Sequence, residues 1–520
     1  MWNKLLASPY LLALLVGIHP ISFYLSNNWY IFPAYRNLLI LGTFAFLIFL
    51  PLATCYFCLS RVFRKRSPSN PPGLFRQLYV LGTILIWTYL LRATFEEFSV
   101  NGFFIALAIA FITLGMGWIS PKTQILHLNT ILFTLCIVNL GNGLYLMQQS
   151  TELTSFIGKG EDHLRQQQYD RVKFQKRPNV YYLVPDGYPN QKGLQEIFGL
   201  DDGSLYQHLE SLDFNIYHAA LSNYSHTLSS LSSTLGMQHH YYQGSIGNSE
   251  LLHSREFVVS DKNPVVRVFR ANDYQVHYVH EKNMMFAKGC FIDFCAPHIF
   301  MGDYLDILFS PTLQNLPFIR RVVDRFHNQS IEQIKTHIDK ISVQPNNYFT
   351  YIHLSSPSHS PTSQQTPDKL ASFREKFPKK IGVANKKITT VIERILTRDP
   401  HALIIINADH GGWGMGAYNW AGPKIFEGVP EKLITLDHLG VLLAIRWPEK
   451  TVPEYGRDIR TNINLFRHIF AYLSESQEIL TTQVPDDGFL TKGKGKEGMV
   501  MNAVHDGKIL EHMIEIGPLK

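Results

Sequence analysis

Two carboxylates and a histidine follow apolar runs that are rich in β-branched and aromatic residues. Asp186 follows the run 180–185, and Asp409 and His410 follow the run 403–408. A continuous apolar run is typical of a buried parallel strand. Ligands of open α/β sheets bind just past the carboxyl ends of such strands. We therefore expect these side chains at one rim, where carboxylate oxygens and an imidazole nitrogen suit a catalytic divalent metal ion.

A hydroxyl-rich segment, 222–235, offers several candidate nucleophiles, among them Thr227 and Ser225. A divalent cation beside a hydroxyl lowers its pKa and makes it nucleophilic near neutral pH. Serine and threonine also cap helices, so the segment could simply be a helix start. The two roles are compatible, because the dipole at a helix N-terminus favours an anionic group.

Further histidines lie near predicted strands. His353 and His359 flank the end of a third apolar run, and an imidazole there suits proton transfer near pH 7; the alternative is a pair of surface loop histidines. We expect His438 to be structural and the cluster 239–242 to form a loop that at most touches a substrate.

The second two thirds of the chain alternates short apolar runs with helical patterns, which predicts an α/β domain with a mostly parallel central sheet. The tail after residue 483 reads as turns and short hairpins. The expected strands are 180–185, 275–280, 347–354, 402–408 and 440–447, and the expected helices are 229–237, 318–341, 380–398 and 461–473.

The first third predicts an all-α transmembrane bundle of about five helices, since a span takes about 17–25 apolar residues. Basic residues at 61–66 and Lys122 place the N-terminus in the cytoplasm by the positive-inside rule, so that the region after residue 148 faces outward. We expect a transmembrane domain at 1–148, a juxtamembrane linker or helix at 149–177 and an external domain at 178–520. The expected spans are 9–26, 37–60, 76–95, 101–119 and 125–147.

The net charge of +6 is partly local to the 61–66 loop, so it indicates a membrane flank and no nucleic-acid partner. Cys290 and Cys295 lie close enough to form a local disulfide in an oxidising compartment, although two free thiols remain an alternative.

Four segments carry the residues named above: 178–188, 222–231, 353–361 and 409–411. In this order they resemble the alkaline phosphatase/sulfatase superfamily, over residues 178–480. The likeness is greatest to its membrane-anchored sulfatase-like branch, which includes lipoteichoic acid synthases and phosphoethanolamine or phosphoglycerol transferases.

The resemblance implies that Thr227 is the nucleophile and a metal ligand, together with Asp186, Asp409 and His410. It also implies that His359 and His353 bind the transferred group or stabilise the leaving oxygen. The family's commoner spacing between these histidines lacks one residue, which makes His359, followed by Ser360 and Pro361, the more secure of the two.

The chemistry implied is phosphoryl transfer with one divalent ion, Zn²⁺ or Mn²⁺. The segment 353–361 offers no carboxylate for a second ion, and threonine at position 227 cannot become the formylglycine of sulfatases.

The first hypothesis is a transferase of the bacterial inner membrane, with its catalytic domain periplasmic or extracellular. It would move a phospholipid-derived phosphoethanolamine or phosphoglycerol group to an envelope glycan or lipid through a phospho-threonine. The alternatives are a phosphodiesterase or phosphatase that uses water, and an inactive scaffold, against which the intact Asp186, Thr227, Asp409 and His410 argue.

Overall fold

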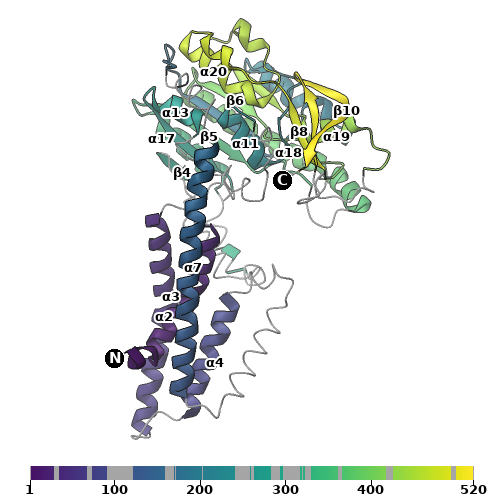
Figure 1. The fold of residues 1–520 in the computed structure, drawn as a ribbon. Coiled ribbons are helices and arrows are strands. Elements are labelled where there is room, and N and C mark those ends of the chain that lie inside the picture. The colour runs from purple at the N-terminus through teal and green to yellow at the C-terminus, as the bar shows by residue number, and fades with distance from the viewer. Residues whose placement is uncertain are drawn as a thin grey trace. The chain divides into compact units, whose positions relative to one another are not determined.

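The computed structural model of the chain describes residues 2–28, 34–66, 73–90, 121–157, 169, 171–201, 203–239, 258, 263–282, 293–296, 317–318, 320–321, 329–360, 366–416, 426–492 and 499–518. Contacts divide the chain into two compact units. The first holds α1–α4 and α7, and the second holds every later element described (Figure 1).

The first unit is helical, and α2 packs against α3, α4 and α7 through apolar side chains such as Leu12, Val16 and Val80. Its helices are α1 (Trp2–Leu6), α2 (Pro9–Asn28), α3 (Ala34–Arg66), α4 (Gly73–Leu90) and α7 (Pro121–Ile157).

Four of the five expected spans fall on these helices, and the fourth span, 101–119, lies outside the described residues. Within the described chain, the one segment long and apolar enough to cross a membrane is Thr123–Tyr145, with 23 residues and a mean hydropathy of 1.5. The apolar stretches in α2, α3 and α4 are shorter, between 10 and 17 residues. The helices are thus confirmed, whereas the five-span bundle stays a prediction.

The second unit is built on a seven-stranded sheet of order β2-β7-β6-β1-β5-β3-β4. The strands β6, β1, β5, β3 and β4 run parallel, while β7 is antiparallel to both β6 and β2. The bounds are β1 (Val180–Pro185), β2 (Asn215–Ile216), β3 (Tyr274–His280), β4 (Phe294–Ala296), β5 (Asn347–Leu354), β6 (Leu403–Asn407) and β7 (Leu443–Arg446). The mostly parallel sheet and its five expected strands are confirmed.

Helices cover both faces of the sheet, which explains why its strands read as apolar runs without alternation. On one face, Phe269 of α13 stacks on Phe349 of β5 with ring centroids 4.2 Å apart. On the other, His337 of α17 places its Nε2 3.1 Å from Nδ1 of His277 in β3. Every residue of β1 is consequently buried. The helices are α9 (Gln191–Phe198), α10 (Gly203–Ser211), α11 (Thr227–Gly236), α13 (Pro264–Arg270), α17 (Ile331–Ser342), α18 (Pro367–Arg398), α19 (Glu431–Leu439) and α20 (Leu465–Ser474).

Two helix starts differ from the expectation because of capping side chains. The stretch 318–341 is not one helix: Ser330 forms a capping box with Gln333, so α17 begins at Ile331. The helix expected from residue 380 begins at Pro367, where Thr366 accepts a hydrogen bond from the backbone of Lys369.

The chain ends in a second sheet of three antiparallel strands, β8 (Gly488–Lys492), β9 (Met499–His505) and β10 (Lys508–Pro518). Asp506 and Gly507 both have positive φ angles, 46° and 70°, as an Asp-Gly hairpin turn requires. The backbone N–H of Phe489 in β8 donates to the carbonyl of Asn223, which ties this sheet to the segment that leads into α11.

Cys295 is disulfide-bonded, whereas Cys290, the partner that the sequence suggests, lies outside the described residues.

Candidate active site and metal centre

The predicted acidic residues lie at the carboxyl ends of the parallel strands. Asp186 directly follows β1, and Asp409 comes two residues after the end of β6. Strand β1 pairs with β6 so that Leu183 lies beside Ile406, which brings both strand ends to the same level. Both carboxylates therefore lie at one edge of the sheet, past the carboxyl ends of β1 and β6, as the apolar runs predicted; we call this edge the rim.

Nε2 of His410 lies at the centre of the predicted ligands. It is 3.2 Å from Oγ1 of Thr227 and 3.5 Å from Oδ1 of Asp186. It is also 3.5 Å from Oδ2 of Asp409. The structure thus brings together the four side chains that the sequence proposed as metal ligands, from segments up to 223 positions apart (409 minus 186).

The hydrogen bonds of His410 determine which ring nitrogen carries the proton. Nδ1 lies 2.8 Å from the carbonyl oxygen of Gly411, which can only accept, so Nδ1 is the N–H donor of the neutral ring. The lone pair of Nε2 then points toward Thr227 and the two carboxylates. This is the tautomer that a metal-binding histidine needs.

Asp409 is oriented by its own turn. Its Oδ1 accepts hydrogen bonds of 3.0 Å from the backbone N–H groups of Gly187 and His410. Its Oδ2 is buried and accepts no hydrogen bond among the described residues, and the same holds for Oδ1 of Asp186. Each carboxylate therefore presents a desolvated oxygen to the same point.

This donor set fits a divalent cation. Buried oxygens without a hydrogen-bond partner are costly unless something positive lies beside them. Ligand bonds of about 2.0–2.2 Å in a tetrahedral site place the ligand atoms about 3.4 Å apart. The distances of 3.2, 3.5 and 3.5 Å from Nε2 of His410 to its neighbours match that spacing.

The electrostatics of the protein without metal point the same way. Burial raises the pKa of Asp186 well above its usual range, and the nearby Asp409 carboxylate adds to the shift. Burial lowers the pKa of His410 to about 3, with a smaller contribution from His359. A bound cation would stabilise such a site, because a neutral imidazole can donate its lone pair to the ion and the positive charge offsets the repulsion between two neighbouring carboxylates.

Thr227 is the first residue of α11, and its half-buried hydroxyl points into this cluster. His226, which precedes it, makes no side-chain capping hydrogen bond, unlike the cap residues of α9, α13, α17 and α18. The first turn of α11 can therefore direct its backbone N–H groups toward negative charge that develops on Thr227.

His359 reaches the same cluster from the loop after β5. It forms a group with Asp186 and His410 whose ligand atoms all lie within 4.8 Å of one another. Its Nδ1 lies 2.6 Å from the carbonyl of Ser360, which leaves Nε2 as the acceptor. Desolvation lowers the pKa of His359, so the ring is neutral at pH 7.

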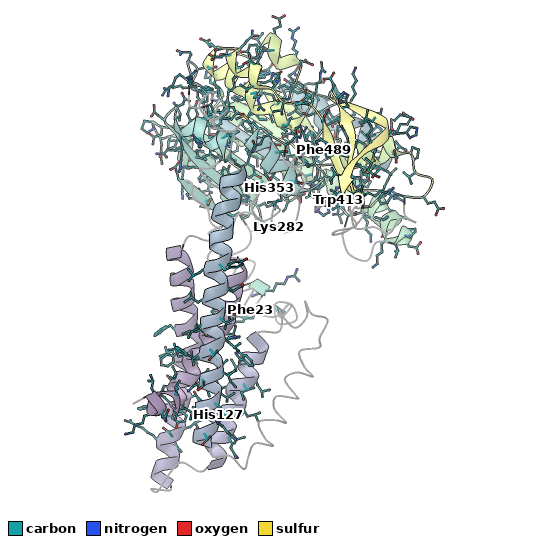
Figure 2. The ribbon with its side chains drawn as sticks, viewed as in Figure 1. Phe23, His127, Lys282, His353, Trp413 and Phe489 are labelled. Atoms are coloured by element: carbon teal, nitrogen blue, oxygen red, sulfur yellow. The ribbon has the colours of Figure 1, made fainter. Side chains whose placement is uncertain are left out.

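His353 occupies a different position from His359. It lies near the end of β5, is only 1% exposed, and its Nδ1 is 2.7 Å from the hydroxyl of Tyr351 (Figure 2). Burial lowers its pKa to about 3. Of the two predicted substrate-binding histidines, His359 lies at the rim, and His353 lies beneath it.

His438 and His239, which the sequence analysis also named, form hydrogen bonds to neighbouring carbonyl and hydroxyl groups. Nδ1 of His438, at the end of α19, lies 2.9 Å from the carbonyl of Ile434. Nδ1 of His239 is 3.0 Å from the hydroxyl of Tyr224, and its Nε2 is 2.9 Å from the carbonyl of Pro485. Both ring nitrogens of His239 are thus used in packing the second sheet, and residues 240–242 lie outside the described chain.

Two residues near the site were missed by the sequence analysis. The ring of Trp413 lies among those of four histidines, and the carboxylate of Asp437 accepts hydrogen bonds of 2.8 Å from the backbone of Gly414 and Met415. A tryptophan inside the glycine-rich run that follows His410 was the one available signal.

Gly411 is expected to tolerate no side chain. A Cβ there would lie 2.1 Å from the carbonyl oxygen of Asp437, a backbone atom that α19 holds in place. We predict that Gly411→Ala lowers the free energy of unfolding by about 1–3 kcal/mol or more, because α19 or the His410 turn must shift. Thermal or urea unfolding of the variant measures this.

The matched control is Gly382→Ala in the middle of α18, where a Cβ meets nothing within 4 Å. Alanine should raise stability there by up to about 1 kcal/mol through helix propensity. Equal effects of the two substitutions would contradict the predicted close approach.

No protein-family model and no curated protein matches the chain. Similar solved structures include the C-terminal periplasmic domain of EcEptC from Escherichia coli, at 11% identity over 61% of this chain and 90% of that chain, with a TM-score of 0.35. Lipoteichoic acid synthase LtaP from Listeria monocytogenes is 14% identical over 66% of this chain and 91% of its own, with a TM-score of 0.37. The integral membrane protein lipooligosaccharide phosphoethanolamine transferase A from Neisseria meningitidis is 10% identical over 91% of this chain and 96% of its own, with a TM-score of 0.36.

At identities of 10–14%, none of these structures indicates what this chain acts on. The mostly parallel sheet and the convergence of Asp186, Thr227 and His410 agree with the fold and the site that the resemblance of the four sequence segments to the alkaline phosphatase/sulfatase superfamily led us to expect.

Proposed function

We propose that this protein is a metal-dependent phosphotransferase whose nucleophile is Thr227. The observation that carries the proposal is the 3.2 Å contact of the Thr227 hydroxyl with His410, beside buried carboxylate oxygens of Asp186 and Asp409 that accept no hydrogen bond in the described chain. A hydroxyl beside metal-type ligands can act as a nucleophile, because a bound metal ion lowers its pKa.

Asp186, Asp409, His410 and Thr227 would hold the metal ion, for which Zn²⁺ and Mn²⁺ both suit the donor set. The bound ion supplies Lewis acidity, which lowers the pKa of the Thr227 hydroxyl and offsets negative charge on the phosphoryl oxygens.

In the first step, Oγ1 of Thr227 attacks the phosphorus atom of a phosphodiester. A bond forms between Oγ1 and phosphorus, the bond from phosphorus to the leaving alcohol oxygen breaks, and the proton that the Thr227 hydroxyl loses is balanced by the one that this oxygen takes up. The N-terminus of α11, where Thr227 is the first residue, can stabilise the charge on the phosphoryl group, because the helix dipole favours an anion there.

In the second step, an acceptor hydroxyl attacks the same phosphorus atom, and the bond to Oγ1 breaks, which regenerates Thr227. The neutral ring of His359 can take the proton of that hydroxyl through Nε2, since Nδ1 donates to the carbonyl of Ser360, and the return of this proton to Oγ1 restores the Thr227 hydroxyl. A glycan or lipid acceptor makes the protein a transferase, whereas water makes it a phosphodiesterase or phosphatase.

We further propose that the donor is a phospholipid with a phosphoethanolamine or phosphoglycerol headgroup. In this proposal residues 1–148 form a multi-pass anchor in the bacterial inner membrane with a cytoplasmic N-terminus, 149–177 form a juxtamembrane segment, and 178–520 are periplasmic or extracellular. The apolar segment Thr123–Tyr145 and the basic loop at 61–66 support an anchor. An anchor would hold a lipid donor at high effective concentration.

The test is mass spectrometry of the detergent-purified protein, quenched rapidly after incubation with bacterial phospholipids and Zn²⁺ or Mn²⁺. We expect a headgroup adduct on the peptide that contains Thr227, with the mass of phosphoethanolamine or phosphoglycerol. Ser225→Ala, which removes the second candidate hydroxyl, should still form the adduct.

Three other outcomes of this experiment would change the proposal. Cleavage of a simple phosphodiester that depends on Thr227, without an adduct from lipids, would support the hydrolase. Absence of both activities in protein with bound metal would exclude the lipid donor and Thr227 chemistry together. An adduct on Ser225 would contradict the choice of nucleophile.

A further inference from the structure

Trp413 is held in a backbone conformation that tryptophan rarely adopts. It follows the glycine pair after His410, is 1% exposed, and has a φ angle of +53°. Bulky residues are disfavoured in the left-handed region, and such outliers concentrate at functional sites. A glycine would adopt this turn more easily, so the structure retains the indole side chain at a cost.

The face of the indole ring packs on the two histidines of the site. Its centroid is 4.0 Å from that of His359, with the planes inclined by 34°. It is 5.1 Å from that of His410, at 24°. Each of these imidazoles is held at Nδ1 by a neighbouring carbonyl, and the indole restricts the remaining rotation of the ring. The directions of both Nε2 lone pairs therefore depend on Trp413.

The edge of the indole ring holds the segment that leads into α11. Nε1–H of Trp413 donates a 3.1 Å hydrogen bond to the carbonyl of Ser225. The ring of His226 meets the indole nearly at right angles, with centroids 4.9 Å apart. Through these two contacts, Trp413 holds the turn before Thr227 from outside the helix.

We propose that Trp413 is a positioning residue with two separable tasks: its face orients the His410 ring for metal binding and the His359 ring for proton transfer, and its N–H holds the turn that places Thr227. Only the effects of Trp413 on proton transfer and on the placement of Thr227 rest on the proposed function. The orientation of His410 can be tested by metal binding, without any substrate.

The two tasks predict different effects for two substitutions. Trp413→Phe keeps an aromatic face but removes the N–H donor. We expect it to bind Zn²⁺ within about 3-fold of the unmodified protein, while kcat for a simple phosphodiester falls about 10-fold at a nearly unchanged KM. Trp413→Leu removes both contacts, and we expect its Zn²⁺ affinity to fall by about 10- to 100-fold as well.

The experiment measures Zn²⁺ affinity by competition with a chromophoric chelator, kcat and KM with bis(p-nitrophenyl) phosphate, and the melting temperature, all on the full-length protein. Trp447→Phe is the matched control, because Trp447 is equally buried and packs on Tyr472, a neighbour outside the site. It should lose stability but keep both affinity and kcat.

Trp413→Phe alone decides the inference if Trp413→Leu does not fold. A fall in kcat at preserved metal affinity supports it. Unchanged kcat, or losses of kcat and affinity that match those of Trp447→Phe, overturn it. If the unmodified protein binds Zn²⁺ but shows no turnover that depends on Thr227, the proposed function fails, while the affinities of the two variants still test the orienting role.

Discussion

Replacing Thr227 with alanine is expected to lower kcat for phosphodiester cleavage by about 10⁴-fold or more, which corresponds to about 5.5 kcal/mol of transition-state stabilisation. The reason is that no other hydroxyl is seen to contact the His410 ring among the described residues. Ser225 instead uses its carbonyl to anchor the indole of Trp413. Steady-state kinetics with a chromogenic phosphodiester measure the effect.

Two controls make the result specific to the Thr227 hydroxyl. Thr227→Ser keeps a hydroxyl at the start of α11 and should retain activity within about 10- to 100-fold. Ser225→Ala should retain nearly all of it. Metal affinity should fall modestly in Thr227→Ala, because three of the four proposed ligands remain. Equal activity in Thr227→Ala and Ser225→Ala would eliminate the covalent mechanism.

Replacing Asp186 with asparagine is expected to have opposite effects on stability without and with metal. In the metal-free protein, burial and the Asp409 carboxylate raise the pKa of Asp186 well above its usual range. The folded state then binds a proton at pH values where the unfolded chain does not. The contribution of Asp186 to stability is therefore present at low pH and is lost as the pH rises from about 4 through the raised pKa, at about 1.4 kcal/mol per pH unit.

Asparagine cannot titrate, so the melting temperature of Asp186→Asn relative to the unmodified protein should increase with pH in the presence of EDTA. Added Zn²⁺ should reverse the order. The unmodified protein gains about 2.7 kcal/mol at a metal concentration 100 times its Kd, and the variant gains less because it lacks a ligand. Differential scanning fluorimetry at several pH values, with EDTA or Zn²⁺, tests both halves.

Asp399→Asn is a suitable comparison. Burial also raises the pKa of Asp399, but its carboxylate binds Asn179 at the opposite, amino end of β1. This variant should show a pH effect without losing the stabilisation by metal. If Zn²⁺ stabilised Asp186→Asn as much as the unmodified protein, Asp186 would not be a ligand.

The sheet and its rim could be predicted because they depend on short-range patterns. The runs 180–185 and 403–406 are continuous apolar stretches because helices cover both faces of the sheet, and this pattern is visible without knowing which helices these are. Strand direction then determines that Asp186 and Asp409 emerge at the same rim. The first residues of the helices were harder to predict from the sequence. The capping box of Ser330 is an example, because it starts α17 at Ile331 although the amphipathic pattern suggested a helix from residue 318.

The sequence by itself therefore determined the class of fold, the carboxylates of the rim and the threonine that starts α11. The tertiary structure alone decided that Nε2 of His410 lies close to Thr227 and to both carboxylates. It also decided that His359 lies beside these ligands, whereas His353 is buried within the sheet. Finally, it placed the ring of Trp413 against His359 and His410. These outcomes depend on loop conformations and ring orientations, which contacts between distant segments help to set, such as the hydrogen bond from Trp413 to Ser225, 188 positions away. Local periodicity and propensity carry no information about such contacts, because they concern neighbours within a few residues along the chain.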